Sequence, residues 1–258
     1  MPCQAHDTTF SSEIDRFRMM YGIRNVVHYK SLSERTDLFD DAVKMFDERI
    51  RQKNDMPLTV SVASLFARAC AILDFFGSAE PSLGIPVSIA LIEATSRKYP
   101  PSHCTYCGHE PCDCPPNKRP NPKEMVHSSM IQTRWTVADW QGMLARRYGK
   151  KNAERGVLHA FSALQNEVVE IRNISFRGAS SKLSNRDTLN RYFEEIGDVF
   201  ARIFALANLP EISVDVGEAI TTYSSFGCPG CGEMVCECDV LQTTKPKQKG
   251  LSSLYCPT

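Results

Sequence analysis

Two clusters of four cysteines constrain this chain more than any other feature of its sequence. Each cluster reads C-x2-C-x4-C-x-C, and the second follows the first by 124 residues at all four positions. Because four thiolates so close together can surround one tetrahedral Zn²⁺, the spacing predicts two closed, structural zinc sites. An iron–sulfur cluster, free thiols and disulfides are the alternatives. The predicted zinc ligands are Cys104, Cys107, Cys112 and Cys114 in the first cluster and Cys228, Cys231, Cys236 and Cys238 in the second.

The similarity between the two halves extends upstream of the cysteines. Residues 65–73 resemble residues 199–207, and residues 85–88 resemble residues 212–215. A repeat this long is not a solenoid period and indicates two copies of one domain, fused as a pseudo-dimer. We predict a first copy over 1–114, a proline-rich linker over 115–134, a second copy over 135–238 and a mobile tail over 239–258. A further homodimer of the whole chain is left open.

The charge balance argues against a protein that coats polyanions. The 258 residues carry 30 basic and 30 acidic side chains, which gives a formal net charge of +0, whereas non-specific nucleic-acid binding relies on excess positive charge. We therefore do not expect a nucleic-acid partner. The apolar runs are too short for a transmembrane helix, and the N-terminus lacks the pattern of a secretory signal. These features predict a cytoplasmic protein without a membrane partner.

Apolar residues recur at helical spacing through the second copy, and no convincing alternating strand pattern is present. The pattern predicts helices over about 136–149, 154–175, 186–208 and 213–223. Thr136 and Asp139 form a capping-box pattern at the first of these helices, and Ser213 is a suitable N-cap for the fourth. We therefore predict an all-α fold of two tandem four-helix units, each of which ends in a small four-cysteine zinc knuckle.

Two acidic pairs lie at the border of the apolar stripes of the second and third of these helices. Glu167 and Glu170 form one pair, and Glu195 and Asp198, preceded by Glu194, form the other. Residues spaced three apart project from the same side of a helix, so all four carboxylates converge if the stripes pack together. Converging carboxylates repel one another unless a cation neutralises them, and oxygen ligands favour Mg²⁺ or Mn²⁺. The alternative is that these acids are ordinary solvated charges.

This ordered pattern of acids, followed by Ala207-Asn208, resembles the metal-binding signature of the MazG-like, all-α nucleoside triphosphate pyrophosphohydrolases. The resemblance covers about residues 136–223 and implies a Mg²⁺-dependent enzyme that releases a nucleoside monophosphate and pyrophosphate. It implies metal binding by Glu167, Glu170, Glu195 and Asp198, a general base in Glu194 or Glu170, and a substrate site that includes Arg177, Lys182, Arg202 and Asn208.

The first copy departs from this acidic pattern. Its sequence places Ser61 and Ser64 opposite Glu195 and Asp198, and Phe46 and Arg49 opposite the acids of the other helix. None of these four side chains can replace a carboxylate as a ligand of a hard metal ion. We therefore expect one catalytic copy and one degenerate copy. A catalytically inactive nucleotide sensor or a zinc-stabilised scaffold is the competing prediction.

Overall fold

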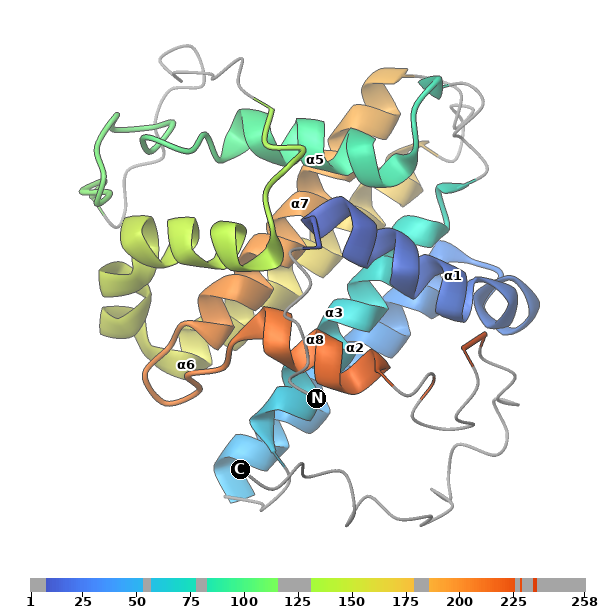
Figure 1. Ribbon diagram of the computed structural model, residues 1–258, viewed down its shortest axis with the longest axis horizontal. Coiled ribbons are helices and arrows are strands. Elements are labelled where there is room, and N and C mark those ends of the chain that lie inside the picture. Colours follow the sequence, from blue (N-terminus) through green and yellow to red (C-terminus); the bar gives the residue numbers. More distant parts are fainter. Residues whose placement is uncertain are drawn as a thin grey trace.

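Helices make up the part of the chain that the computed structural model describes, which is residues 8–52, 57–77, 83–115, 131–178, 186–225, 228 and 234–235 (Figure 1). The predicted all-α class is confirmed there, since the described residues contain no strand beyond an isolated bridge between Thr9 and Thr136. The helices are α1 (Phe10–His28), α2 (Leu32–Gln52), α3 (Leu58–Asp74), α5 (Val87–Lys98), α6 (Val137–Gly178), α7 (Arg186–Ala207) and α8 (Val216–Ser224).

The helix ends follow from local capping chemistry. The predicted capping box is confirmed, because the Asp139 amide donates to Thr136 Oγ1 at 3.1 Å and the Thr136 amide donates to Asp139 Oδ2 at 2.9 Å. The predicted break near residues 149–154 is wrong. The chain instead kinks within α6 at Gly156, where φ is 75° and ψ is 175°, a conformation that glycine adopts without steric cost.

The predicted N-cap of the last helix is also wrong. Ser213 has a φ of 46°, whereas an N-cap residue needs an extended backbone. Asp215 has that backbone, and its Oδ1 accepts a hydrogen bond from the Glu218 amide at 2.8 Å. Helix α8 therefore begins at Val216, and residues 213–215 form the turn that leads into it.

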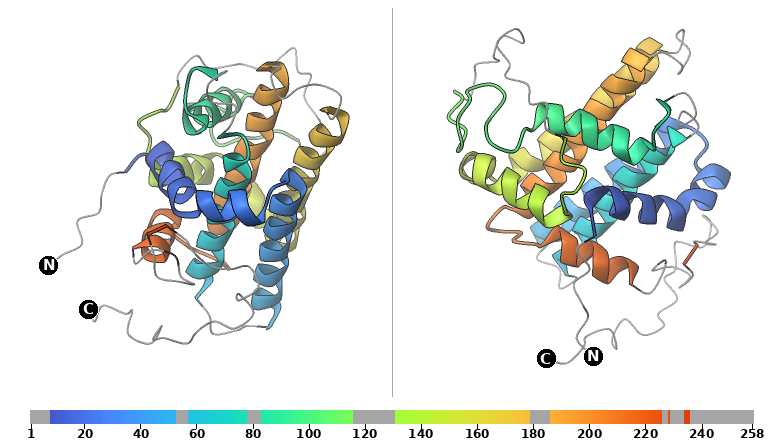
Figure 2. Two further views of the ribbon diagram at one scale, coloured as in Figure 1. Left: turned by 90° about the vertical axis from the view of Figure 1, so that its right-hand side faces the viewer. Right: turned by 45° about the horizontal axis from the view of Figure 1, so that its top comes forward.

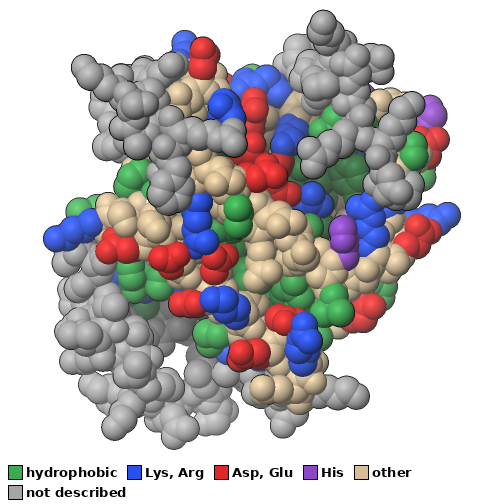
Figure 3. All heavy atoms as spheres, turned by 180° about the vertical axis from the view of Figure 1, so that it is seen from behind, with side chains coloured by type: hydrophobic (Ala, Val, Ile, Leu, Met, Phe, Trp, Pro, Cys, Tyr) green, Lys and Arg blue, Asp and Glu red, His purple; other side chains and the backbone are tan. Residues whose placement is uncertain are grey.

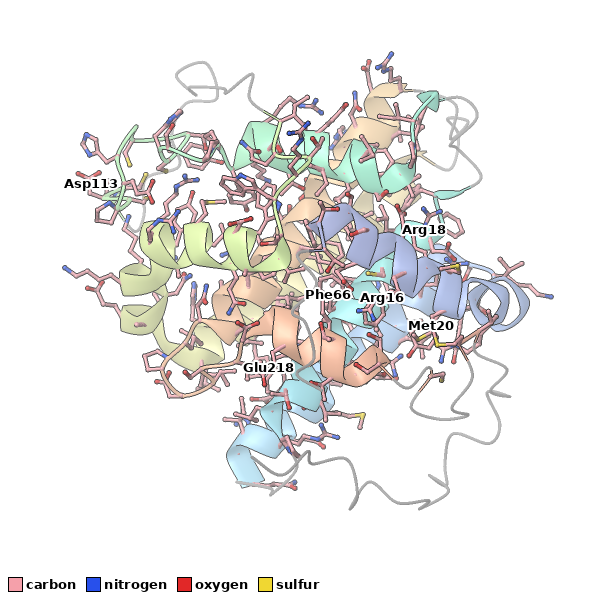
Figure 4. The ribbon with its side chains drawn as sticks, viewed as in Figure 1. Arg16, Arg18, Met20, Phe66, Asp113 and Glu218 are labelled. Carbon is pink, nitrogen blue, oxygen red and sulfur yellow. The ribbon has the colours of Figure 1, made fainter. Side chains whose placement is uncertain are left out.

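Four long segments form the centre of the molecule: α2, α3, α7 and the part of α6 after its kink. Helices α1, α5 and α8 lie across them (Figure 2). One hydrophobic cluster runs through both halves of the chain. Phe66 of α3 lies near its middle (Figure 4), with its ring centroid 5.2 Å from that of Phe200 of α7. Phe10 of α1 packs against both rings, at 6.0 and 5.2 Å.

Two short helices, α5 and α8, each pack on a helix of the other half of the chain. Helix α5 packs on α7 of the second half, and α8 packs on α3 of the first half. The bridge between Thr9 and Thr136 joins the caps of the first helix of each half, and the Phe66–Phe200 contact joins two residues that the repeat aligns. Two copies related by a two-fold axis would make reciprocal contacts of this kind. The duplication and its domain boundaries stay predictions.

Several sequence predictions fall on residues that the structure does not describe. These include residues 116–130 of the predicted linker, the whole predicted tail, and Cys231, Cys236 and Cys238. None of the helices in the described part of the chain combines the length and the hydrophobicity that crossing a bilayer requires. On the face seen in Figure 3, acidic and basic side chains are interspersed and no extended basic area is visible.

Candidate metal centres

Three of the predicted acids converge where α6 packs on α7. Glu167 and Asp198 are buried, at 7% and 6% exposure, and Glu195 is half-buried between them. One carboxylate oxygen from each lies within 4.8 Å of the other two. Glu170 is exposed and interacts with Glu195, so it lies at the rim of this carboxylate group. Glu194 is not part of the group.

Two of the three carboxylates, those of Asp198 and Glu167, have hydrogen-bond donors or cations as partners. Lys98 forms an ion pair with Asp198 Oδ2, and the Tyr99 hydroxyl donates to Asp198 Oδ1 at 2.8 Å. Arg202 Nε donates to Glu167 Oε1 at 2.9 Å. The third carboxylate is less well satisfied, because Glu195 Oε2 is buried without a hydrogen-bond partner. A buried carboxylate oxygen without a hydrogen-bond donor destabilises the folded state, and a cation bound at this point would offset that destabilisation.

Two of the carboxylates, those of Glu195 and Glu167, hold their protons more tightly than usual. Burial raises the pKa of Glu195 to about 7 against the opposing effect of Lys98, and Asp198 and Glu170 raise it further. Burial and then Asp198 also raise the pKa of Glu167. Burial acts to lower the pKa of Lys98, but Asp198 and the neighbouring glutamates raise it overall. The three carboxylates face two cations, Lys98 and Arg202, so deprotonation of Glu195 adds negative charge that these cations do not balance.

This electrostatic arrangement predicts a pH-dependent stability. Because the pKa of Glu195 is raised in the folded state, its contribution is present below its unfolded pKa near 4.5 and is lost as pH rises through about 7. Without divalent metal, the free energy of unfolding should fall by about 1–3 kcal/mol over this interval. Urea unfolding at pH 5 and pH 8 measures the fall. Glu195→Gln should reduce it, and an equal fall in that variant would contradict the assignment.

The sequence analysis missed Lys98 and Tyr99. Both lie at the C-terminal end of α5, in the half of the chain that lacks the acids, and the crossing of α5 onto α7 brings them to Asp198. The repeat could have pointed to Tyr99, because Tyr99 precedes Tyr223 by the same 124 residues that separate the cysteine clusters. The site therefore combines carboxylates from the second half with a lysine and a tyrosine from the first.

A close helix contact holds this combination in place. Gly197 of α7 faces Thr95 of α5, and a Cβ atom at Gly197 would lie 2.5 Å from Thr95 Oγ1. We expect Gly197→Ala to push α5 away and to destabilise the protein by about 1–3 kcal/mol. Adding Thr95→Ala to Gly197→Ala removes the clashing hydroxyl and should restore part of the lost stability. Thermal unfolding of the two single variants and the double variant tests this, and strictly additive effects would count against the contact.

The remaining predicted substrate residues are not all assembled at the carboxylates. Arg202 is there, in its hydrogen bond with Glu167. The amide of Asn208 instead exchanges hydrogen bonds with Gln141, at 3.0 Å to the side chain and 3.1 Å to the backbone oxygen. Lys182 and the side chain of Arg177 lie outside the described residues.

The first cysteine cluster forms a compact loop that packs on the first part of α6. The four Sγ atoms of Cys104, Cys107, Cys112 and Cys114 lie within 4.8 Å of one another. Gly108, with a φ of 73°, allows the turn between the second and third cysteines. Burial acts against ionisation of Cys104, but backbone amides that face its sulfur lower its pKa to about 7. This loop can therefore hold a thiolate-binding metal such as zinc.

Positive charge under the loop fits a four-thiolate metal site. Zn²⁺ with four thiolates carries a net charge of about −2. Lys151 Nζ donates to Cys112 Sγ at 3.2 Å. Arg147 is 1% exposed, donates to the Pro100 oxygen, and is in no ion pair with an acid of the described chain. These two cations balance the charge that a bound zinc site would introduce. Of the second cluster, only Cys228 is described, and it is buried.

Comparisons with protein families, with curated proteins and with solved structures found no match to this chain. The function is therefore inferred from the two centres themselves.

Proposed function

We propose that the chain is a Mg²⁺-dependent nucleotide pyrophosphohydrolase that cleaves a nucleoside triphosphate to the monophosphate and pyrophosphate. The observation that carries this proposal is the convergence of Glu167, Glu195 and Asp198, with a buried Glu195 oxygen that lacks a donor. Two basic side chains, Lys98 and Arg202, border the same carboxylates. Hard oxygen ligands beside cations are what a metal–triphosphate complex requires.

The three acids would hold the metal, which when bound would act as a Lewis acid for the phosphates and lower the pKa of a water molecule. With the metal on the carboxylates, Lys98 and Arg202 are free to donate to phosphate oxygens. Exposed Glu170, which interacts with Glu195, would accept a proton from the attacking water. The water oxygen bonds to the α-phosphorus, the bond from that phosphorus to the bridging oxygen breaks, and pyrophosphate leaves with the electron pair.

The cofactors of this proposal are catalytic Mg²⁺, or Mn²⁺, and one structural zinc ion at each cysteine cluster. The substrate is a ribo- or deoxyribonucleotide, and the proposed location is the cytoplasm. Incubating the protein with NTPs and dNTPs, with and without Mg²⁺ or Mn²⁺, tests the activity. Chromatography should show equal amounts of monophosphate and pyrophosphate. Release of inorganic phosphate and diphosphate instead would contradict cleavage at the α-phosphorus.

A nucleotide sensor without turnover is the second candidate. It is favoured by the ion pairs that already occupy Asp198 and Glu167, because a cation must compete with Lys98 and Arg202 for them. Calorimetry separates the two functions. Metal-dependent nucleotide binding without hydrolysis of any nucleotide in the panel would support the sensor and reject the enzyme.

A further inference from the structure

Two arginines in the first half form no ion pair with an acid of the described residues. Arg24 of α1 and Arg68 of α3 are half-buried, and the Nε atom of each is buried without a hydrogen-bond partner. Neither guanidinium forms an ion pair with an Asp or Glu among the described residues; the nearby Asp41 is highly exposed and pairs with Lys44 at 3.4 Å. Buried cations are normally paired, so this pair needs an explanation.

Tyrosines surround the two guanidinium groups. The Arg24 guanidinium carbon lies 4.6 Å from the Tyr21 ring centroid and 5.7 Å from that of Tyr29. Tyr223 of α8 is close enough to interact electrostatically with both arginines. We call these five residues the arginine–tyrosine cluster. Burial first, and then the like charge of Arg24, lowers the pKa of Arg68, as expected where negative charge is missing.

In the predicted repeat, two residues of the cluster correspond to residues at the carboxylate group. The repeat aligns Arg68 with Arg202, and Tyr223 follows Tyr99 by the cysteine offset. Tyr21 and Tyr148 stand at the same distance from the caps of the first helix of their halves. The basic and aromatic side chains are thus present in both places. The acids are not, because serines stand opposite Glu195 and Asp198.

We propose that the arginine–tyrosine cluster binds a phosphate group without a metal ion. Guanidinium groups recognise phosphate through the N–H donors at their edge, and a ring stacked on the guanidinium face leaves these donors free. A phosphate oxygen would supply negative charge beside these two guanidinium groups. The phosphate comes from inorganic phosphate, from pyrophosphate or from a nucleotide. This inference does not depend on the proposed hydrolysis, because it uses different residues and no divalent cation.

Calorimetry without added divalent cation tests the proposal, with inorganic phosphate, pyrophosphate and ATP titrated separately. Arg68→Gln should weaken the affinity for the phosphate-bearing probe at least about tenfold, since it removes a charged donor. Arg51→Gln is the control, because Arg51 of α2 lies in the same half, is exposed and pairs with Asp47 at 2.8 Å. It should change the affinity less than about twofold. Binding of inorganic phosphate identifies the free anion as sufficient, and binding of ATP alone identifies a nucleotide site.

Thermal unfolding shows whether a loss of binding in Arg68→Gln comes from a folding defect. In phosphate-free buffer, Arg68→Gln should unfold at a higher temperature than the wild type, because it removes an unpaired, half-buried charge. Phosphate should raise the unfolding temperature of the wild type and not of this variant. Two results would overturn the proposal. One is a lower unfolding temperature for Arg68→Gln together with no anion binding by the wild type. The other is anion binding by the wild type that Arg68→Gln leaves intact.

Discussion

Asp198→Asn is expected to reduce nucleotide hydrolysis at least about 100-fold, since losing even an outer-shell partner of a metal ligand costs about 10–100-fold. The neutral amide keeps the shape of Asp198 and removes the charge that the metal and Lys98 share. Glu195→Gln should have a similar effect, because Glu195 supplies the carboxylate oxygen that has no donor of its own. Initial rates of pyrophosphate release at saturating Mg²⁺ measure both effects.

Glu194→Gln provides the matched control. Glu194 is a neighbour of Glu195 on α7 but is not part of the carboxylate group, so its substitution should leave the rate within about threefold of the wild type. Mn²⁺ binding, followed by electron paramagnetic resonance, gives a readout besides activity, and Asp198→Asn should weaken it. Full activity of Asp198→Asn and Glu195→Gln would remove the carboxylate group from the reaction and with it the proposed function.

Cys112→Ser is expected to lower the unfolding temperature by about 5–15 °C and to reduce hydrolysis as well. Losing a thiolate opens the four-cysteine site, with an expected cost of about 2–5 kcal/mol, comparable to that of a lost structural disulfide. The effect on activity follows from three contacts that hold the end of α5 against the loop and against the first part of α6, on which the loop packs. Thr105 Oγ1 donates to the Lys98 oxygen at 3.2 Å, Arg147 donates to the Pro100 oxygen, and the Tyr99 and Tyr148 rings meet edge to face at 6.4 Å.

The control for this prediction is Tyr106→Ala. Tyr106 lies in the same loop but is 41% exposed and is not a predicted ligand, so its loss should leave both the unfolding temperature and the rate nearly unchanged. Metal analysis of the purified proteins should find less zinc in Cys112→Ser than in Tyr106→Ala. Equal zinc content and equal unfolding temperatures would show that the first cluster does not hold a structural metal.

Local pattern was enough to locate the acids, but the partners of those acids depend on packing across the chain. The spacing of Glu195 and Asp198 beside an apolar stripe placed both on the side of α7 that faces α6, because helical periodicity decides which face is buried. Lys98 and Tyr99 could not be assigned in this way. The sequence of α5 does not determine whether this helix packs on α3 of its own half or on α7 of the other half. In the structure it packs mainly on α7.

The errors at helix boundaries have a similar cause. Gly149 and Gly156 lie close together in α6, and either could have ended the first segment. Only Gly156 has a positive φ, and which glycine takes that conformation depends on where the following segment must run to reach α7. Ser213 was a reasonable N-cap by residue type alone. Its backbone is set by the turn after α7, where the Ser213 amide donates to the Leu209 oxygen at 2.8 Å.

The packing of α8 on α3 has a consequence for how the protein is made on the ribosome. Helix α3 ends at Asp74, whereas α8 spans Val216–Ser224, so the surface of α3 that α8 covers is synthesised long before its cover. Contacts between segments so distant in sequence form late and slow folding. During translation the apolar side of α3 stays uncovered until α8 has emerged from the ribosome. Nascent chains with exposed apolar surface are prone to aggregate or to need a chaperone.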